Sequence, residues 1–209
     1  MNNVLLDPLP ETWTNAAGET FQLDTDFRIG IQICLLQQDS ELTAYDKTLL
    51  IRDLLFTDDA PTDAEDIDRC LQFFMNGWNH DKPSGKKEKH RLQDFDVDQW
   101  RIYAAFRSQY QINLTIEEMH WWEFMGLLSA LSECAYTRVI DIRQKDIKPK
   151  MDKDSRKALQ EAKTVYTLDP VLTHDEQALM DHMGDLLGQT AAERKRIEDF
   201  ERYGINNGS

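Results

Sequence analysis

The chemistry that this sequence could support starts with a single Glu-x-x-His motif. Glu117 and His120 stand three positions apart, a spacing that puts a carboxylate and an imidazole on one face of a helix. Di-iron carboxylate bundles require two such motifs and a Glu from each of two further helices. The chain contains only one motif, so we expect no metal site and place the His120 imidazole at a helix surface or interface beside Trp121.

The three cysteines, Cys34, Cys70 and Cys134, are far apart in the sequence and lie in apolar settings. No CxxC pair and no neighbouring His accompanies them, which argues against a zinc site, a disulfide framework and a nucleophilic cysteine, and favours reduced thiols. The run Pro83-Ser84-Gly85-Lys86-Lys87 lacks the preceding Gly of a phosphate-binding Walker loop. We therefore expect no catalytic residue, no cofactor and no enzymatic activity.

Net charge is distributed unevenly along the chain. Residues 1–80 hold four Lys and Arg against fifteen Asp and Glu, a net charge of −11, and residues 81–209 hold twenty against twenty-three, a net charge of −3. An acidic surface repels phosphate backbones, so we expect no nucleic-acid partner. The acidic residues form either a self-repelling solvated surface or a face for a basic partner.

No apolar run approaches the roughly 18 residues that a membrane-spanning helix needs. The first residues, MNNVLLDPLPETW, lack the basic flank and the continuous apolar segment of a signal peptide. We expect no membrane association and no export by that route, which together with reduced thiols predicts a cytoplasmic protein.

The elements that position these residues centre on Thr115–Ile147, which the apolar spacing predicts to be one long helix. Thr115 and Glu118 have the spacing of a capping box at its start. Two faces can be followed along it: Trp121, Phe124, Leu128, Leu131 and Ala135 on one, and Trp122, Met125, Ser129 and Ser132 on the other. Adjacent Trp side chains point about 100° apart on a helix, so both are buried only if neighbours flank it on two sides. We expect a central core helix.

Shorter elements precede this helix. Residues 12–14 and 20–23 alternate around an Asn-Ala-Ala-Gly loop, which predicts a β-hairpin that packs on the helices. Capping residues and apolar spacing predict four helices. They are one after Asp24–Asp26 with Phe27, Ile31, Cys34 and Leu35; one after Thr43 with Tyr45, Leu49, Leu50 and Leu54; one after Thr62 or Asp63 with Ile67, Leu71, Phe74, Met75 and Trp78; and one from Asp96 with Val97, Trp100, Tyr103, Ala104 and Tyr110.

Two polar stretches complete the chain. Residues 80–94 predict an exposed loop, whose basic residues are either solvated or an interaction patch. We divide the chain into a helical core domain, 1–147, and a polar helical C-terminal extension, 148–209. In the extension, residues 173–176 cap a helix, and a thin apolar stripe contacts either a partner or the chain's own body. That stripe consists of Ile197, Phe200 and Tyr203.

Several groups of residues, taken in order, resemble the bacteriophage gene-product-fifteen family between about residues 13 and 147. They are Thr25-Asp26-Phe27-Arg28, Ala105-Phe106 with Tyr110, Ile112-Asn113-Leu114, His120-Trp121-Trp122-Glu123-Phe124 with Leu127-Leu128 and Leu131, and Ile140-Asp141-Ile142-Arg143 with Asp146-Ile147. From these groups we select a core signature of His120, Trp121, Trp122, Phe124 and Arg143. The expected fold is mainly α: a multi-helix globular domain with a short N-terminal β-hairpin and a helical C-terminal extension.

The resemblance implies a tail-module protein of long-tailed phages, encoded just ahead of the tape-measure gene. That position is typical of tail assembly chaperones, so the expected function is a non-enzymatic chaperone or adaptor in the host bacterial cytoplasm. Its expected partner is the tape-measure protein or another tail protein, with Ile197, Phe200 and Tyr203 as the contacts. Two alternatives remain open: a structural tail component retained in the virion, and a metal-dependent helical enzyme.

Overall fold

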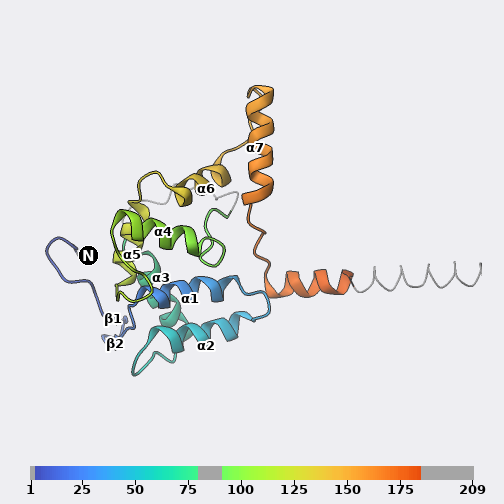
Figure 1. Cartoon of the computed structure of the whole chain (residues 1–209). Coiled ribbons are helices and arrows are strands. Elements are labelled where there is room, and N and C mark those ends of the chain that lie inside the picture. Colours follow the sequence, from blue (N-terminus) through green and yellow to red (C-terminus); the bar gives the residue numbers. More distant parts are fainter. Residues whose placement is uncertain (1–2, 80–90, 185–209) are drawn as a thin grey trace, which may run out of the picture. The chain divides into compact units, whose positions relative to one another are not determined.

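The chain is mainly α-helical with a short N-terminal β-hairpin, as the sequence predicts (Figure 1). The computed structural model describes residues 3–79 and 91–184. In chain order its elements are β1 (Thr12–Thr14), β2 (Thr20–Gln22), α1 (Phe27–Gln38), α2 (Ala44–Leu55), α3 (Ala64–Asn76), α4 (Gln99–Gln109), α5 (Trp121–Ser129), α6 (Ala135–Gln144) and α7 (Lys153–Tyr166), and residues 174–184 form a further helix. Contacts divide the chain into two units, 1–38 with 44–170 and 39–43 with 171–209.

The hairpin forms where the sequence predicts it and packs on a helix. β1 and β2 are antiparallel, and Trp13 pairs with Phe21, their rings stacked at 6.2 Å. Gly18 in the connecting loop has φ +87°, a conformation that glycine adopts without steric cost. The Phe21 ring meets Phe56 at 5.9 Å, and Leu23 bridges to Phe56 just after α2. These contacts give the hairpin the support that two isolated strands lack.

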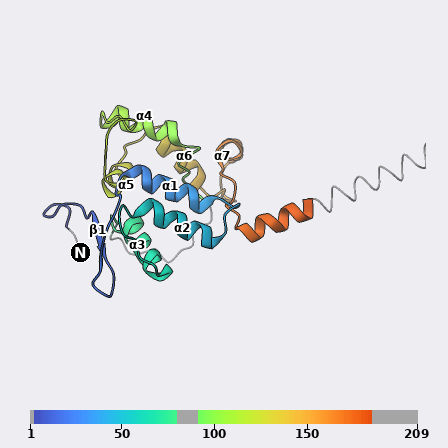
Figure 2. The ribbon, with the colours of Figure 1, turned by 90° about the horizontal axis from the view of Figure 1, so that it is seen from below.

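The first three helices enclose one side of the core. α1 lies beside α2, α2 contacts α3, and α1 and α3 both contact α5 (Figures 1 and 2). Asp63 caps α3 by accepting from the Glu65 N–H, which resolves the choice between Thr62 and Asp63 as the start of that helix. Ile67, Cys70, Leu71 and Phe74 make up its buried face.

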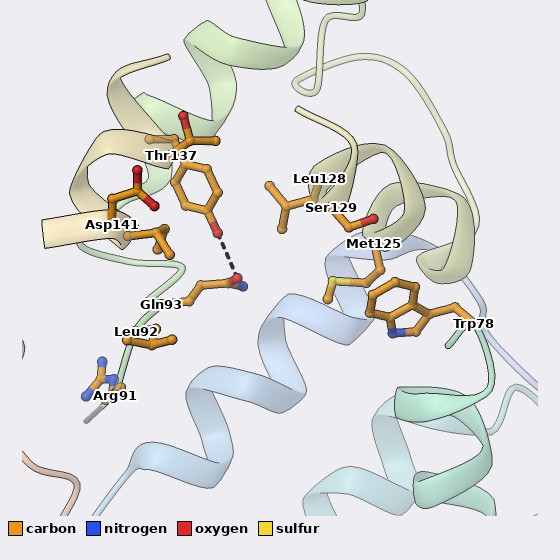
Figure 3. Close-up of a pocket in the computed structure, with 11 residues that line it drawn as sticks. Trp78, Arg91, Leu92, Gln93, Met125, Leu128, Ser129, Thr137 and Asp141 are labelled. Atoms are coloured by element: carbon orange, nitrogen blue, oxygen red, sulfur yellow. Dashed lines mark hydrogen bonds between the residues drawn. The ribbon is translucent and has the colours of Figure 1, made fainter. Parts of the chain in front are cut away.

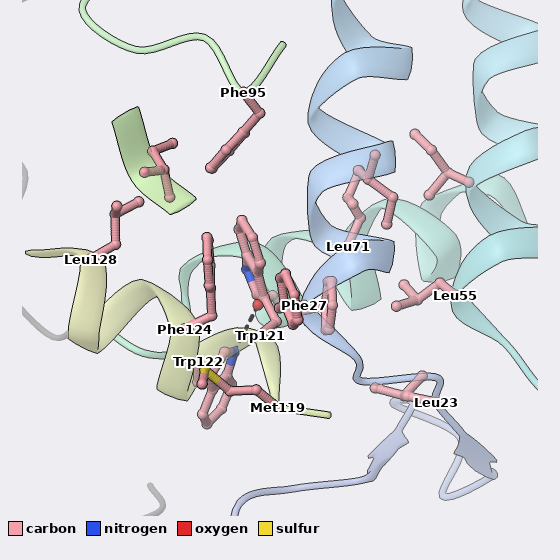
Figure 4. Close-up of a cluster of buried hydrophobic side chains, with 14 of the residues drawn as sticks. Leu23, Phe27, Leu55, Leu71, Phe95, Met119, Trp121, Trp122, Phe124 and Leu128 are labelled. Carbon is pink, nitrogen blue, oxygen red and sulfur yellow. Dashed lines mark hydrogen bonds between the residues drawn. The ribbon is translucent and has the colours of Figure 1, made fainter. Parts of the chain in front are cut away.

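Trp121 lies at the centre of the core, with 1% of its surface exposed. Its ring stacks on Phe124 at 5.8 Å and on Phe74 at 6.2 Å. Phe124 in turn stacks on Phe27 at 4.9 Å and on Phe106 at 5.1 Å; Figure 4 labels Trp121, Phe124 and Phe27. α1 comes closest to the Trp121 ring at Gly30, where an added Cβ would lie 2.2 Å from Trp121 Cε3. The large ring thus fits only because α1 has no side chain at that position.

Trp122 points in a different direction from its neighbour and is also buried, with 8% exposed. Its indole N–H donates to the carbonyl of Phe74 at 2.7 Å, and its ring meets Phe73 edge to face at 5.2 Å (Figure 4). At Gly77, just past α3, a Cβ would lie 2.2 Å from Trp122 Cζ2. The two Trp side chains are therefore held by different neighbours, as their angular separation on the helix requires.

The prediction of one helix over Thr115–Ile147 is wrong at its start. The Thr115 hydroxyl donates to the Asn113 side chain at 2.8 Å, in a turn, and forms no capping box. α5 begins only at Trp121, whose N–H donates to the carbonyl of Thr25 at 2.8 Å. The chain before α5 runs extended because it bonds to the residues that lead into α1.

The same prediction is also wrong in the middle, where α5 ends at Ser129 and a turn separates it from α6. Leu131 in that turn is buried, so the apolar spacing continues although the helix does not. Cys134 is the N-cap of α6, and its N–H donates to the Thr137 hydroxyl at 2.8 Å. Both helices face one core, so periodicity alone could not locate the break.

Two other helices bury different residues from those predicted. Tyr45 and Leu50 of α2 are 72% and 40% exposed, and Val97 and Trp100 near the start of α4 are 54% and 74% exposed. The buried residues are instead Ile51 and Leu55 in α2, and Ile102, Ala105 and Phe106 in α4. In α4 the stack of Phe106 on Phe124 sets the rotation of the helix, a tertiary contact that its own spacing does not reveal.

The later part of the chain contains α7, which packs on α6, and the helix 174–184, which starts where the sequence predicts a cap. Thr173 and Glu176 exchange reciprocal bonds at the start of the helix 174–184, the predicted capping arrangement. The division at residues 147 and 148 stays a prediction. Residues 80–90 of the basic loop and the Ile197, Phe200 and Tyr203 stripe lie outside the described residues.

A matched pair of Trp substitutions tests this core. Trp121→Ala removes a buried aromatic that its surroundings cannot replace and should lower the free energy of unfolding by about 3–5 kcal/mol. Trp100→Ala removes an exposed ring and should change it by about 0.5 kcal/mol or less. Denaturant melts of both variants measure the difference. Equal effects would mean that the core is not organised around Trp121.

Candidate protein-binding groove

No constellation of metal-binding side chains occurs in the described part of the chain, which contains no group of three or more His, Cys, Asp and Glu suited to a metal ion. Glu117 and His120 do not share a helix face, because both precede α5. Burial raises the pKa of the Cys34 and Cys70 thiols to about 12, so both stay protonated at neutral pH and are poor nucleophiles. Within residues 3–79 and 91–184, neither the Glu117 and His120 pair nor these two thiols has the geometry of a reactive site.

His120 has a structural role at the start of α5. Its Nδ1 accepts from the Trp122 N–H at 3.0 Å, which makes it the N-cap. A neutral ring that accepts at Nδ1 carries its proton on Nε2, and Nε2 lies 3.1 Å from the carbonyl of Pro10. Burial lowers the pKa of His120 below its usual value and so favours this neutral form. His120 thereby ties the segment before β1 to α5.

Residues of the family-like run at 25–28 meet the segment before α5. The Phe27 N–H donates to the carbonyl of Met119 at 2.9 Å. Arg28 forms an ion pair with Asp26 and donates from Nη2 to the carbonyls of Leu114 and Glu117, each at 2.9 Å. Two of the runs that carry the resemblance, 25–28 and 120–124, therefore meet in one structural joint between α1 and α5.

Arg143 forms a second joint, around a buried ion pair. Its side chain is 2% exposed, and Asp98, its partner, is fully buried. Arg143 Nη1 and Nη2 donate to the two carboxylate oxygens of Asp98 at 2.5 and 3.1 Å. Two further donors reach main-chain carbonyls, Nη1 that of Leu92 at 2.9 Å and Nε that of Tyr166 at 2.7 Å. One guanidinium thus connects α6 to the segment before α4 and to the end of α7.

The segment 91–98 is held by further bonds from its own side chains. Asp94 accepts from the N–H groups of Asp96 at 2.7 Å and Val97 at 2.9 Å, and it also pairs with Arg91. Asp98 accepts from the Asp94 N–H at 3.2 Å. These bonds position the preceding residues, Leu92 and Gln93, so that they face α6.

A groove of about 560 Å³ opens between this segment, α5 and α6 (Figure 3). Six of its eleven lining residues are apolar or aromatic, and five are polar or charged. The lining residues are Trp78, Leu92, Met125, Leu128, Tyr136 and Ile140, together with Arg91, Gln93, Ser129, Thr137 and Asp141. This volume lies within the range of about 300–1,000 Å³ typical of small-molecule sites.

Three of the polar side chains of the groove form hydrogen bonds with neighbouring groups. The Tyr136 hydroxyl donates to Gln93 Oε1 at 2.7 Å, the bond drawn as a dashed line at Gln93 in Figure 3. Ser129 donates to the carbonyl of Gly126 at 2.7 Å, and Thr137 donates to that of Cys134 at 3.1 Å. An occupant therefore meets an apolar surface with few open hydrogen-bonding positions, which favours apolar contacts.

The residues of the core signature lie at two separate places in the structure. His120, Trp121, Trp122 and Phe124 gather at the start of α5, and Arg143 stands in the separate joint with Asp98. None of these residues lines the groove. Sequence reasoning did not find the groove, although it placed Met125 and Ser129 on the second face of the central helix. That face was the available signal, since it carries two of the lining residues.

A family model described as Bacteriophage Gp15 protein matches residues 5–168, more than three quarters of the chain. The match includes both joints and every residue of the groove. The search of curated proteins and the search of solved structures found no match.

Breaking the Arg143 joint should be costly. Asp98→Asn leaves the buried guanidinium without its counter-charge and should lower the free energy of unfolding by about 3–5 kcal/mol. Glu133→Gln removes the partner of Arg138, an exposed pair at 3.0 Å, and should cost at most about 1 kcal/mol. Denaturant melts at neutral pH compare the two variants. A small loss in Asp98→Asn would show that the joint contributes little.

His120 should make stability depend on pH. Because its pKa is lower in the folded chain than the ordinary value of 6.5, the unfolded chain binds the proton more readily. The contribution of neutral His120 is therefore present above pH 6.5 and is lost as the pH falls below that value toward the folded pKa. His120→Asn keeps a capping oxygen that does not titrate.

Melts of both chains from about pH 7 to about pH 5 test this dependence. The wild-type chain should lose more stability over that interval than His120→Asn, because the two chains differ only at this residue. Parallel curves would mean that His120 protonates without breaking the cap.

Proposed function

The chain belongs to the bacteriophage Gp15 family, and from this membership we propose that it is a non-enzymatic tail assembly chaperone or adaptor for the tape-measure protein. At the coarser level, it is a bacteriophage protein of particle structure or assembly. The finer role follows from what a chaperone for a long helical client needs. It needs a stable body, apolar surfaces that helices can cover, and charge that keeps the complex from aggregating.

The observation that carries this proposal is the uncovered apolar face of the helix 174–184. Leu179, Met180 and Met183 are 60%, 57% and 53% exposed. Its apolar face has the i, i+4 spacing of a segment that packs on another helix. Methionine side chains adapt to varied surfaces, which suits a protein that holds a client for a limited time.

Charge supports the same role. The chain carries a formal net charge of −14, which keeps copies apart and increases the solubility of a complex that they join. None of the helices in the described part of the chain has the length and hydropathy of a membrane span. We propose that the chain acts in the host cytoplasm while tails assemble.

A structural tail component is the second candidate, because the same apolar face could serve a permanent contact in the virion. The two roles differ in what happens after assembly: a chaperone leaves, whereas a tail component stays at a fixed copy number. The third reading, a metal-dependent helical enzyme, has no support in the described residues, where no metal-binding group was found.

Co-expression with the tape-measure protein of the same phage or prophage tests the proposal. The wild-type chain should raise the soluble fraction of that protein and co-purify with it, because the apolar face covers client helices. The double variant Leu179→Glu/Met183→Glu puts charge on that face and should lose most of the effect. The control Ala178→Glu/His182→Glu adds charge at exposed positions about 100° around the same helix and should keep it.

Mass spectrometry of purified particles then separates the first two candidates. A chaperone should be absent or far below the level of the tail proteins. Stoichiometric amounts in the particle would make the structural reading correct. No gain in tape-measure solubility with the wild-type chain would contradict the chaperone reading.

A further inference from the structure

We propose that the groove between α5, α6 and residues 91–93 binds one apolar helix of a partner protein, oriented by a Lys or Arg of that helix against Asp141. This inference rests on the proposed function in one respect, because the proposed partner is the client or another tail protein. The site itself follows from the lining, the hydrogen bonds and the charges of the groove.

The lining has the arrangement of a groove for a helix. α5 contributes Met125, Leu128 and Ser129, at spacings of three and four. α6 contributes two pairs at a spacing of four, Tyr136 with Ile140 and Thr137 with Asp141. The lining residues of each helix therefore extend over more than one turn, so the groove can receive side chains repeated along an amphipathic helix. Met125 and Trp78 lie together at one side of the groove, opposite the α6 residues (Figure 3).

The charge at the rim defines the partner further. Asp141 is exposed, and its carboxylate takes part in no hydrogen bond or ion pair with the residues that the structure describes. Arg91, the other charged residue of the lining, already pairs with Asp94. The unpaired charge at the rim of the groove is thus the Asp141 carboxylate. A cationic side chain at one edge of the incoming helix would complement it.

The same properties argue against other occupants. Phosphate-containing ligands would meet an unpaired carboxylate and a chain of net charge −14. A small polar metabolite would find few polar groups that are not already bonded within the groove. A second copy would bring the same large negative charge, which opposes association.

Two synthetic peptides provide the probe. Both are alanine-based helices of about 18 residues with leucines at i, i+3, i+4 and i+7, one flanked by lysines and the other by glutamates. They are titrated into the full-length chain while NMR follows the Met125 methyl group and the Trp78 indole N–H. The lysine peptide should shift both signals saturably, and the glutamate peptide should bind at least about tenfold more weakly.

Charge reversal makes the test specific. Asp141→Arg should invert the preference, so that the glutamate peptide binds better than the lysine peptide. Asp59→Arg makes the same change at an exposed loop position outside the groove and should leave the preference unchanged. Because Asp141 is exposed and unpaired in the described structure, the variant should keep the wild-type melting curve, and that curve is measured alongside.

A steric pair adds a test that does not depend on charge. Ser129→Phe places a ring in the groove and should abolish the shifts at Met125. Ala130→Phe, at the next and also exposed position, lies outside the lining and should keep them. Binding that survives Ser129→Phe would overturn the proposal.

Other results identify a different occupant and would also overturn it. Peptide-induced shifts confined to Met180 and Met183 would place binding on the C-terminal helix. A change at Met125 caused by Phe200→Asp without any peptide would mean that the chain's own C-terminal segment fills the groove. Shifts that depend on protein concentration alone would indicate a second copy.

Failure of this inference can be told apart from failure of the proposed function. If the tape-measure protein co-purifies equally with the wild-type chain and Asp141→Arg, the groove is not its site, while the chaperone role stands. If the wild-type chain binds the lysine peptide but does not affect the tape-measure protein, the groove stands and the chaperone role fails.

Discussion

The buried pair of Arg143 and Asp98 is the constraint on which the later half of the fold depends. Burying two charges costs several kcal/mol unless geometry and further hydrogen bonds offset that cost. Here both carboxylate oxygens are used, and two further guanidinium donors reach the carbonyls of Leu92 and Tyr166. Lys163 adds a bond from α7 to the Arg143 carbonyl at 2.9 Å. Three separate stretches of chain are therefore placed by one side chain, and one of them forms a wall of the groove.

The aromatic core places the other wall. α5 begins where it does because its first N–H bonds to Thr25, and its two Trp side chains fit because Gly30 and Gly77 leave room. Once Trp121 and Trp122 are fixed, the remaining face of α5 presents Met125 and Ser129 to the groove. Contacts with the core thus fix the position and rotation of α5. Its outer face is therefore preorganised for a partner.

Local signals were enough for part of this structure. The hairpin, the Asp63 cap and the Thr173–Glu176 cap could be predicted because neighbouring residues alone decide them. The start of α5 could not, because it depends on backbone bonds to residues about a hundred positions earlier. The exposure of Trp100 was also missed, since packing of Phe106 on Phe124 sets the rotation of α4. The groove combines three segments with the pair of Asp98 and Arg143, 45 positions apart, which no local pattern reveals.

The groove and the two joints also depend on one another energetically. Residues 91–93 have little packing of their own and are positioned by Asp94, Asp98 and Arg143, so a change in either acid would alter the groove without touching its lining. Partner binding and the free energy of unfolding would then fall together. A loss of binding in a core variant would therefore not show that the substituted residue contacts the partner. Rim positions such as Asp141 and Ser129 avoid this coupling, because they contact the groove but are exposed and carry no part of either joint. For that reason, the rim and not the family-like signature at 120–124 is where recognition can be separated from folding.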